Sequence, residues 1–391
     1  MISVSDALSI INNTSYTPLS KTVALQNAYE LTLASDVVSS IHMPPFRQSA
    51  MDGYALLTHK DLNYKVIGEV KAGDSDDYRL KPGQAIRIFT GARVPDFADT
   101  IIIQENVTRI NNNITIETTV QKGQNIRLAG EQIKKGDIAL KKGTKLTPAA
   151  IGFLAGLGID RVDVYSTPKV GIIVTGNELV QPGKKLTEGK IYESNSIQLE
   201  AVLNQQGVKE ITKYVVEDEY QNTLNTIANA LQNNDLVLIS GGISVGDYDF
   251  VKEALSELKT EELFYKIKQK PGKPLFYGKN DQTLVFALPG NPASSLTCFY
   301  IYVLPIIQKM MGIANSGLIR TQKKCSSNFN KKGNRAQFLK AKIDGEQVEI
   351  LEGQSSAMLH TFAIANALVY LSEDQNEISK GNTVETILLP V

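Results

Sequence analysis

Residues 235–258 read "DLVLISGGISVGDYDFVKEALSEL", and this stretch decides the fold. An uninterrupted apolar run, "LVLI", is followed by a turn rich in glycine and serine and then by a segment with helical spacing. Strands that are apolar at every position are typical of parallel sheets, which helices cover on both faces. The stretch therefore predicts one strand–turn–helix unit of an α/β domain.

The same alternation of strand and helix continues on both sides of this stretch. Gly207 is expected to end the first helix and Pro305 the last one. The pattern predicts a central parallel α/β domain over residues 168–313, with helices on both faces of the sheet. Strands are expected at 169–176, 211–218, 235–242 and 283–290, and helices at 194–207, 219–232, 247–258 and 293–304.

The flanking regions have a different texture. Short β-type runs alternate with Gly, Asp and Asn turns over 43–145, which predicts a mostly-β insert domain. Residues 314–391 are again strand-like and predict a small C-terminal β-barrel. Residues 1–42 and 146–167 are expected to form a helical connecting domain, so the chain is predicted to be elongated and multi-domain. Its helices are expected at 3–13, at 23–33 and after Thr147 and Pro148.

Composition excludes several classes of function. The chain has 391 residues, and its 41 Lys and Arg balance 41 Asp and Glu, so no basic field favours nucleic acid or a membrane surface. The longest apolar runs fall short of the roughly 20 residues that span a bilayer. Two cysteines and three scattered histidines offer no zinc spacing. With no basic leader at the N-terminus, we expect a cytoplasmic protein.

The glycine-rich turn at 240–246 is a candidate anion site. Ligands of open parallel sheets bind at the carboxyl ends of the strands, and glycine turns there let several N–H groups converge on a phosphate. The turn is not a Walker loop, because the Gly-Lys-Ser/Thr ending is missing. Asp247 and Asp249 follow it directly. Either they share a Mg²⁺ with the phosphate, or one of them merely caps the next helix; the stretch alone does not decide between these readings.

Other polar groups are expected at the same edge of the sheet. "TGNEL" offers Glu178 and "VVEDE" offers Asp218, each just after a strand. "IKQKPGKPLFYG" at 267–278 places three lysines around a Pro-Gly turn, and "LPGNPASS" at 288–295 is a rigid turn that opens a helix. Charged strand ends are often simply solvated. Their number at one edge nevertheless favours a site for a polyanion.

Several motifs together resemble a known family. "PPFRQSAMDGYAL" (44–56), "IRIFTGARVPDFADTIIIQE" (86–105), "SGGISVGDYDF", "KPGKP", "LPGNP" and "QSSAMLHTFAIANALVYL" occur in the family's order. Over nearly its whole length the chain is similar to the molybdopterin molybdenumtransferases, the MoeA proteins and the E domain of gephyrin. The resemblance implies a transferase of molybdenum cofactor biosynthesis. Such an enzyme inserts molybdate into adenylyl-molybdopterin with Mg²⁺ and releases AMP. It also implies a homodimer whose active site is shared between subunits.

The resemblance also implies roles for individual residues. Asp52, Glu178, Asp218 and Asp249 match the metal-binding or catalytic acids, and Thr90 matches a residue that binds near them. Asp52 is expected to come from the partner subunit. The motifs give the phosphate cradle to Gly241, Gly242, Ser244 and Gly246. Lys270, Lys273 and Ser356 are expected near the oxyanion or the entering molybdate.

The chain departs from the family's pattern at several positions. Gln132 and Asn177 stand where acids are usual, Phe97 stands where a glycine is usual, and "SAML" replaces "SGML". Loss of two acids could weaken metal binding. Alternative readings are a non-catalytic dimeric scaffold that binds molybdopterin, a molybdopterin adenylyltransferase, and a nucleotide amidohydrolase with the same α/β domain. The sequence does not distinguish molybdate from tungstate.

Overall fold

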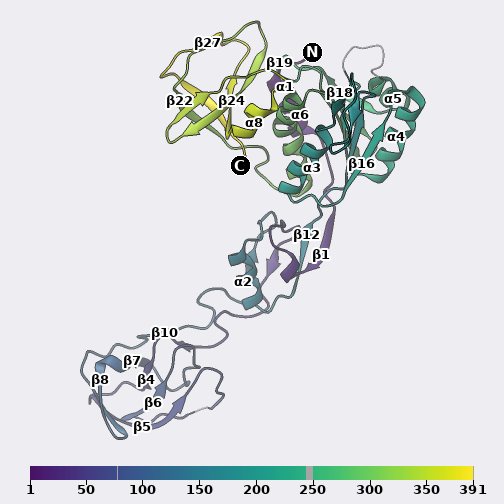
Figure 1. Cartoon of the computed structure of the whole chain (residues 1–391). Coiled ribbons are helices and arrows are strands. Elements are labelled where there is room, and N and C mark those ends of the chain that lie inside the picture. The colour runs from purple at the N-terminus through teal and green to yellow at the C-terminus, as the bar shows by residue number, and fades with distance from the viewer. Residues whose placement is uncertain (77, 244–249, 391) are drawn as a thin grey trace. The chain divides into compact units, whose positions relative to one another are not determined.

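The computed structural model describes residues 1–76, 78–243 and 250–390 (Figure 1). The chain divides into two compact units. The first comprises Met1–Lys21, Glu30–Thr32 and Val164–Val391, and the second comprises Thr22–Tyr29 and Leu33–Asp163. Each unit has hydrophobic clusters of its own.

A six-stranded sheet forms the centre of the first unit, in the order β16-β13-β17-β21-β20-β18. The four strands predicted from the sequence are parallel, as expected. Two further strands, β20 and β18, extend the sheet antiparallel, so it is mixed and not purely parallel. The segment between these two strands is too short for a crossover helix, which a parallel connection requires. The strands are β13 (Val170–Thr175), β16 (Ile211–Val216), β17 (Leu236–Ser240), β18 (Glu261–Tyr265), β20 (Phe276–Asn280) and β21 (Thr283–Leu288).

Helices cover both faces of this sheet (Figure 1). Successive residues of β13 point to opposite faces: Ile172 packs into the cluster of α1, α3, α6 and α7, and Ile173 into that of α4 and α5. Burial on both faces explains why the strand sequences are apolar throughout. The helices are α1 (Val4–Asn13), α3 (Asn195–Gln205), α4 (Tyr220–Asn233), α5 (Val251–Glu257), α6 (Pro292–Cys298) and α7 (Leu304–Met310).

The prediction that Pro305 ends the last helix is wrong. A π-helical segment, Phe299–Val303, follows α6, and Pro305 lies at the start of α7, which continues to Met310. Proline lacks the N–H of a regular helix interior and its ring clashes with the preceding turn. The wider π turn interrupts the regular ladder there, so the chain continues past the proline as a new helix.

The C-terminal part of the first unit is a closed five-stranded barrel, as predicted. The strands pair in the cycle β24-β25-β22-β28-β26, and β26 returns to β24. A short strand, β19 (Gln269–Lys270), pairs with the start of β24 and so connects the lysine-rich turn to the barrel. The barrel strands are β22 (Arg320–Cys325), β24 (Ala336–Asp344), β25 (Gln347–Ile350), β26 (Ala367–Leu371) and β28 (Thr383–Leu388), with α8 (Leu359–Ile364) and the pair β23 (Phe329–Asn330) and β27 (Glu377–Ile378) beside them.

The second unit is mostly β, as predicted for residues 43–145. Its main sheet has the order β7-β4-β6-β5-β9-β8. Only glycine fits at position 53, because a Cβ there would lie 2.0 Å from the carbonyl oxygen of Ile102 on the neighbouring strand. The strands are β4 (Gly53–Leu56), β5 (Asn63–Val70), β6 (Gln84–Ile88), β7 (Thr100–Ile103), β8 (Val107–Ile110) and β9 (Asn113–Ile116).

Of the helices expected in the connecting region, two are confirmed and one is wrong. Ser3 caps α1 with a capping box, and Thr147 caps α2 (Pro148–Gly156). Residues 23–33 form no helix beyond a single 3₁₀ turn, Leu25–Asn27, which follows β1 (Ser20–Ala24). Because β1 pairs with β12 (Arg161–Tyr165), tertiary pairing overrides local helix propensity here.

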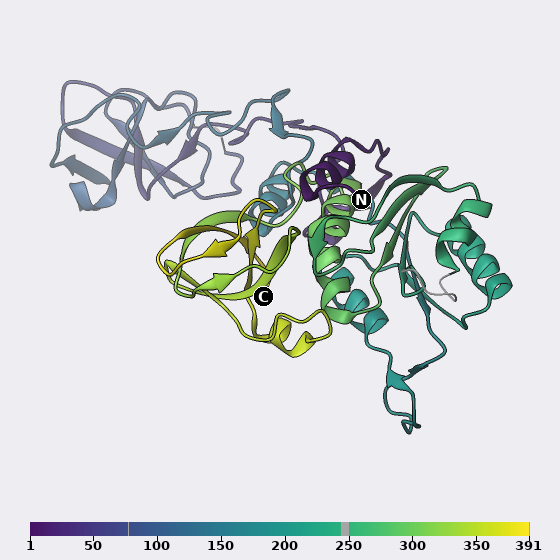
Figure 2. The same ribbon diagram turned by 90° about the horizontal axis from the view of Figure 1, so that it is seen from above.

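The remaining elements are short. Figure 2 shows the segment that connects the parallel strands β14 and β15 extending away from the central sheet. Among the described residues, no helix combines the length and the apolar character needed to cross a membrane. The short elements are β2 (Val37–Val38), β3 (Gln48–Ser49), β10 (Ile126–Arg127), β11 (Ile138–Leu140), β14 (Leu179–Val180), β15 (Ile191–Tyr192) and the 3₁₀ turn Gln104–Asn106.

Candidate active site

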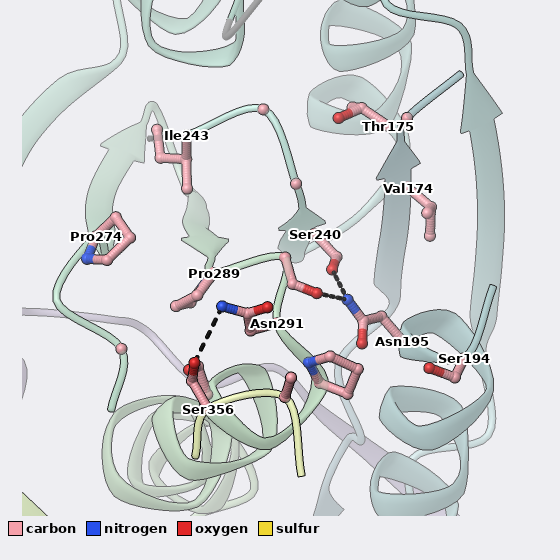
Figure 3. A pocket seen from close by; sticks show the side chains of 18 of the residues that line it. Val174, Thr175, Ser194, Asn195, Ser240, Ile243, Pro274, Pro289, Asn291 and Ser356 are labelled. Carbon is pink, nitrogen blue, oxygen red and sulfur yellow. Dashed lines mark hydrogen bonds between the residues drawn. The ribbon is translucent and has the colours of Figure 1, made fainter. Parts of the chain in front are cut away.

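A pocket of about 760 Å³ lies in the first unit, at the carboxyl ends of β13, β17 and β21 (Figure 3). The turns that follow these strands form part of its wall. The Lys270–Lys273 turn and the barrel loop with Ser356 complete it. The pocket therefore lies where ligands bind in open α/β sheets.

The start of the glycine-rich turn packs closely against β13. Gly241 and Gly242 have φ angles of +97° and +61°, which other residues rarely adopt. A Cβ on Gly241 would lie 2.8 Å from the carbonyl oxygen of Thr175, and one on Gly242 would lie 2.8 Å from Cγ2 of Val251. The hydroxyl of Thr175 is buried beside both glycines and has no hydrogen-bond partner among the described residues. The two glycines are thus required by packing as well as by backbone conformation.

The two acids expected at the strand ends, Glu178 and Asp218, both line the pocket. Asp218 is held by a reciprocal pair of hydrogen bonds with Asn177. The backbone N–H of Asn177 donates to the Asp218 carboxylate at 3.2 Å, and the backbone N–H of Asp218 donates to Asn177 Oδ1 at 3.1 Å. The amide oxygen of Asn177 accepts a bond that a carboxylate at this position would also accept. The departure from the family's acid therefore removes a charge beside Asp218 but keeps its anchor.

Three cationic side chains line the pocket: Lys270, Lys273 and Arg335. The two lysines are exposed and follow each other around the Pro-Gly turn, as the sequence predicted. Arg335 directly precedes the barrel strand β24. It was not predicted as a site residue from the sequence. A single arginine in "NRAQFL" carries no signal of its own. Only the pairing of β19 with β24 brings it beside the lysine turn.

Two asparagines connect the segments that line the pocket (Figure 3). Asn195, at the start of α3, donates from Nδ2 to Ser240 Oγ and to the carbonyl oxygen of Gly290, both at 2.7 Å. Asn291 donates from Nδ2 to Ser356 Oγ at 3.2 Å. Sequence reasoning assigned neither residue a role. The signal was their position, each between a strand end and a helix start.

Lys340 holds the loop that carries Ser356. The Lys340 side chain is buried, and its Nζ donates to the carbonyl oxygens of Gly353, Ser355 and Met358 at 2.7, 3.2 and 3.0 Å. Burial lowers the pKa of Lys340 from its ordinary value. The three carbonyl groups occupy all three donors of the ammonium. Lys340 therefore fixes the backbone on both sides of Ser356.

Asp52 and Thr90 lie in the second unit and contact each other. The backbone N–H and the hydroxyl of Thr90 both donate to Asp52 Oδ1 at 2.8 Å. The hydrogen bond from the Thr90 backbone, and then that from its hydroxyl, lower the pKa of the exposed Asp52 carboxyl. Thr90 was expected near the acids of the site, and in the structure it lies directly beside Asp52. Its two hydrogen bonds hold Asp52 as a carboxylate acceptor.

A smaller hollow of about 480 Å³ also lies in the second unit. It is lined by the "MPP" segment together with Arg127, Glu131 and Gln132. The backbone N–H of Gln132 donates to the carbonyl oxygen of Met43 at 2.9 Å. Gln132, the second departure from the family's acids, therefore lines this hollow of the second unit.

Comparisons with known proteins agree along the whole chain. Sequence profiles match the MoeA N-terminal region (domain I and II) at residues 2–158, a probable molybdopterin binding domain at 171–309 and the MoeA C-terminal region (domain IV) at 322–389. A molybdopterin molybdenumtransferase of Haemophilus influenzae is 35% identical over 375 residues, which cover 92% of this chain and 91% of the relative. The chain belongs to the MoeA family.

Other members of the MoeA family have the same extent. A molybdopterin molybdenumtransferase of Staphylococcus aureus is 31% identical over 99% of this chain and 95% of its own length. The crystal structure of a MoeA molybdopterin biosynthesis protein from Pyrococcus horikoshii aligns with a TM-score of 0.86 and 31% identity, covering 99% of each chain. Fold and sequence therefore agree on the same family.

For this MoeA family member, the structure brings most of the predicted site residues into one pocket. Asp52 and Thr90 are not among the pocket's residues, because they belong to the other unit. Ser244, Gly246 and Asp249 lie outside the described residues. The predicted residues that line the pocket are Glu178, Asp218, Gly241, Gly242, Lys270, Lys273 and Ser356.

The side chains that line this MoeA pocket suit a magnesium ion that they share with other ligands. Among the residues that the structure describes, no group of three or more His, Cys, Asp or Glu side chains is placed to hold a metal ion. Three carboxylates line the pocket. Glu193 is buried and accepts hydrogen bonds from the backbone N–H and the hydroxyl of Ser196, which leaves Glu178 and Asp218 for a cation. Protein-bound Mg²⁺ often takes only one or two carboxylates and completes its shell with water and substrate phosphates. The described residues therefore suit a magnesium ion that arrives with a phosphorylated substrate.

Proposed function

We propose that this chain inserts molybdate into adenylyl-molybdopterin and releases AMP. Its place in molybdenum cofactor biosynthesis follows from its family, and its curated relatives are named molybdopterin molybdenumtransferases. The adenylylated substrate and the release of AMP are our proposal for this chain.

The observation that carries the proposal is the distribution of charge in the pocket. Three carboxylates and three cationic side chains line the same hollow, and Gly241 and Gly242, just after β17, line it as well. Cleavage of a phosphoric anhydride depends on positioning and charge neutralisation more than on a side-chain nucleophile. Lysine and arginine side chains can hold phosphate or molybdate oxygens, and the glycine turn offers backbone N–H groups. A pocket of this kind suits a diphosphate-linked nucleotide.

Magnesium is part of the proposal. Glu178 and Asp218 would hold the ion, and Asp249 is a further candidate by motif. The ion would neutralise negative charge on the phosphate oxygens. The role left to Asn177 is to hold Asp218 in place through the hydrogen bonds described above.

We also propose a homodimer in which Asp52 of the partner subunit completes the site. The support is α2, whose sequence "PAAIGFLAG" is apolar or glycine at every position although only Leu154 is buried. A helix that is apolar all round is normally buried, so a second copy is the expected cover. A cytoplasmic location is proposed too, because both cysteines are free thiols, as is usual in a reducing compartment.

The test is incubation of the purified protein with adenylyl-molybdopterin, Mg²⁺ and molybdate, with AMP measured by chromatography. We expect AMP release that requires both the metal and molybdate. Binding of the nucleotide without any AMP release would favour the non-catalytic scaffold. Formation of adenylyl-molybdopterin from ATP and molybdopterin would favour the adenylyltransferase.

A further inference from the structure

A buried glutamine supports the cationic side of the pocket, which is the side lined by Lys270, Lys273 and Arg335. Gln269 is fully buried, and its Nε2 donates to the carbonyl oxygens of Pro271 and Gly272 at 3.0 and 3.2 Å. Its Oε1 accepts a hydrogen bond from the hydroxyl of Tyr302. Because a carbonyl oxygen can only accept, the NH₂ group of the amide must face the turn. Tyr302 therefore donates to the amide oxygen, and it fixes which way the amide points.

The turn that this amide binds leaves little room. Gly272 has a φ of +82°, and a Cβ there would lie 2.5 Å from the sulfur of the buried Cys298. Pro271 and Gly272 are also the two residues that separate Lys270 from Lys273. The Gln269 side chain thus binds both peptide carbonyls that set the spacing of the two lysines.

The main chain of Gln269 is connected to the third cation. Arg335 donates from Nη1 to the carbonyl oxygen of Gln269 at 3.3 Å. Residues 269 and 270 pair with the barrel strand that follows Arg335. One residue is therefore in contact with the supports of all three cations that line the pocket.

We propose that Gln269 is a positioning residue for anion binding, oriented by Tyr302, which holds Lys270, Lys273 and Arg335 in a convergent arrangement. It touches no substrate itself, because it is fully buried. The anion would be a diphosphate, so the inference builds on the proposed function. The arrangement of the cations is independent of which reaction follows.

The test measures binding of inorganic pyrophosphate by calorimetry, without metal, to the full-length protein. Gln269→Met keeps the length of the side chain but removes both polar groups. We expect it to raise the dissociation constant about tenfold, which corresponds to a loss of ~1.4 kcal/mol. Tyr302→Phe removes only the group that orients the amide and is expected to raise the constant about threefold. Gln232→Met, at an exposed position of α4, is the matched control and should bind like the wild type.

A double-mutant cycle separates positioning from a general structural effect. If Gln269 acts through the lysine turn, Gln269→Met should change binding less in a Lys273→Ala background than in the wild type, since coupled residues are not additive. Equal effects in both backgrounds would overturn the proposal. Thermal unfolding of each variant checks that it is folded, and Tyr302→Phe serves if Gln269→Met does not fold.

Other outcomes distinguish this inference from the proposed reaction. Pyrophosphate binding that depends on Gln269, in a protein that releases no AMP, would support the positioning role and contradict the proposed function. A wild-type protein that does not bind pyrophosphate would overturn the positioning role. AMP release and binding unchanged in both variants would overturn it while leaving the proposed function intact.

Discussion

On the cationic side of the pocket, Lys270 and Lys273 stand on a turn that the buried Gln269 binds from behind. On the acidic side, Glu178 is exposed, and the anchor of Asp218 is the exposed residue Asn177. Cations held by the core can receive an oxyanion without rearranging, which is the general advantage of preorganised charge. Carboxylates on surface loops can adjust as a hydrated metal ion enters. The two sides are therefore suited to different partners.

The largest effect is expected from removing charge on the acidic side. Glu178→Gln should lower the turnover number for AMP release about 100-fold, because the proposed magnesium ion loses one of its carboxylates. Its melting temperature should stay unchanged, because the side chain is exposed. Glu188→Gln, in the exposed segment between β14 and β15, is the matched control. Equal rates of AMP release by the two variants would show that Glu178 has no role in the site.

A second variant tests whether Asn177 positions Asp218. Asn177→Ala removes the oxygen that accepts from the Asp218 N–H, and we expect the Mg²⁺ concentration for half-maximal AMP release to rise about tenfold. Asn177→Asp keeps an acceptor oxygen and should lie closer to the wild type. The measurement is a magnesium titration at saturating substrate. If the alanine variant titrates like the wild type, the acidic side needs no such anchor.

A third variant breaks the support beneath Ser356. Lys340→Met leaves three backbone carbonyls without their donor and should lower the free energy of unfolding by about 1–3 kcal/mol. We expect the KM for adenylyl-molybdopterin to rise about threefold with little change in turnover, as for a loss of uniform binding. Lys342→Met, exposed on the same strand, is the control. If stability falls while the KM is unchanged, Lys340 contributes to the stability of the barrel and not to substrate binding.

The smallest effect is expected on the pKa of Asp52, the predicted site acid that lies in the second unit. Two hydrogen bonds from Thr90 lower the pKa of Asp52, so Thr90→Val should let this pKa rise, although not fully, since the backbone N–H still donates. Asp52's contribution to stability is present above its ordinary pKa and is lost as the pH falls through the lowered one. Carbon-13 NMR titration of the carboxyl group measures the shift. Thr108→Val, on β8 of the same unit, should leave the pKa of Asp52 unchanged, and an unchanged pKa in Thr90→Val would assign the effect elsewhere.

Several parts of the site could be predicted because topology makes them neighbours. Glu178, Asp218 and Gly241 each follow a strand of one parallel sheet, and the carboxyl ends of such strands lie at the same edge. Apolar runs and helical spacing are enough to identify those strands. The convergence of these residues in one pocket follows from that pattern.

Other parts carried no local signal. Arg335 reaches the pocket because β24 pairs with β19, and Gln269 acts from the core through contacts with Tyr302. The helix expected at 23–33 was wrong because β1 pairs with β12, and Pro305 continues a helix because a π turn precedes it. Each of these outcomes depends on residues that are distant in the sequence or on a neighbouring turn.

By itself, the sequence determined the alternation of strands and helices, the mostly-β insert, the C-terminal barrel and the edge of the sheet where ligands bind. It could do so because burial leaves a periodic pattern of apolar residues along the chain. Only the tertiary structure decided which cations share the pocket with the acids and which buried side chains hold them. Those contacts join segments without any common period, so they exist only once the barrel and the sheet have packed together.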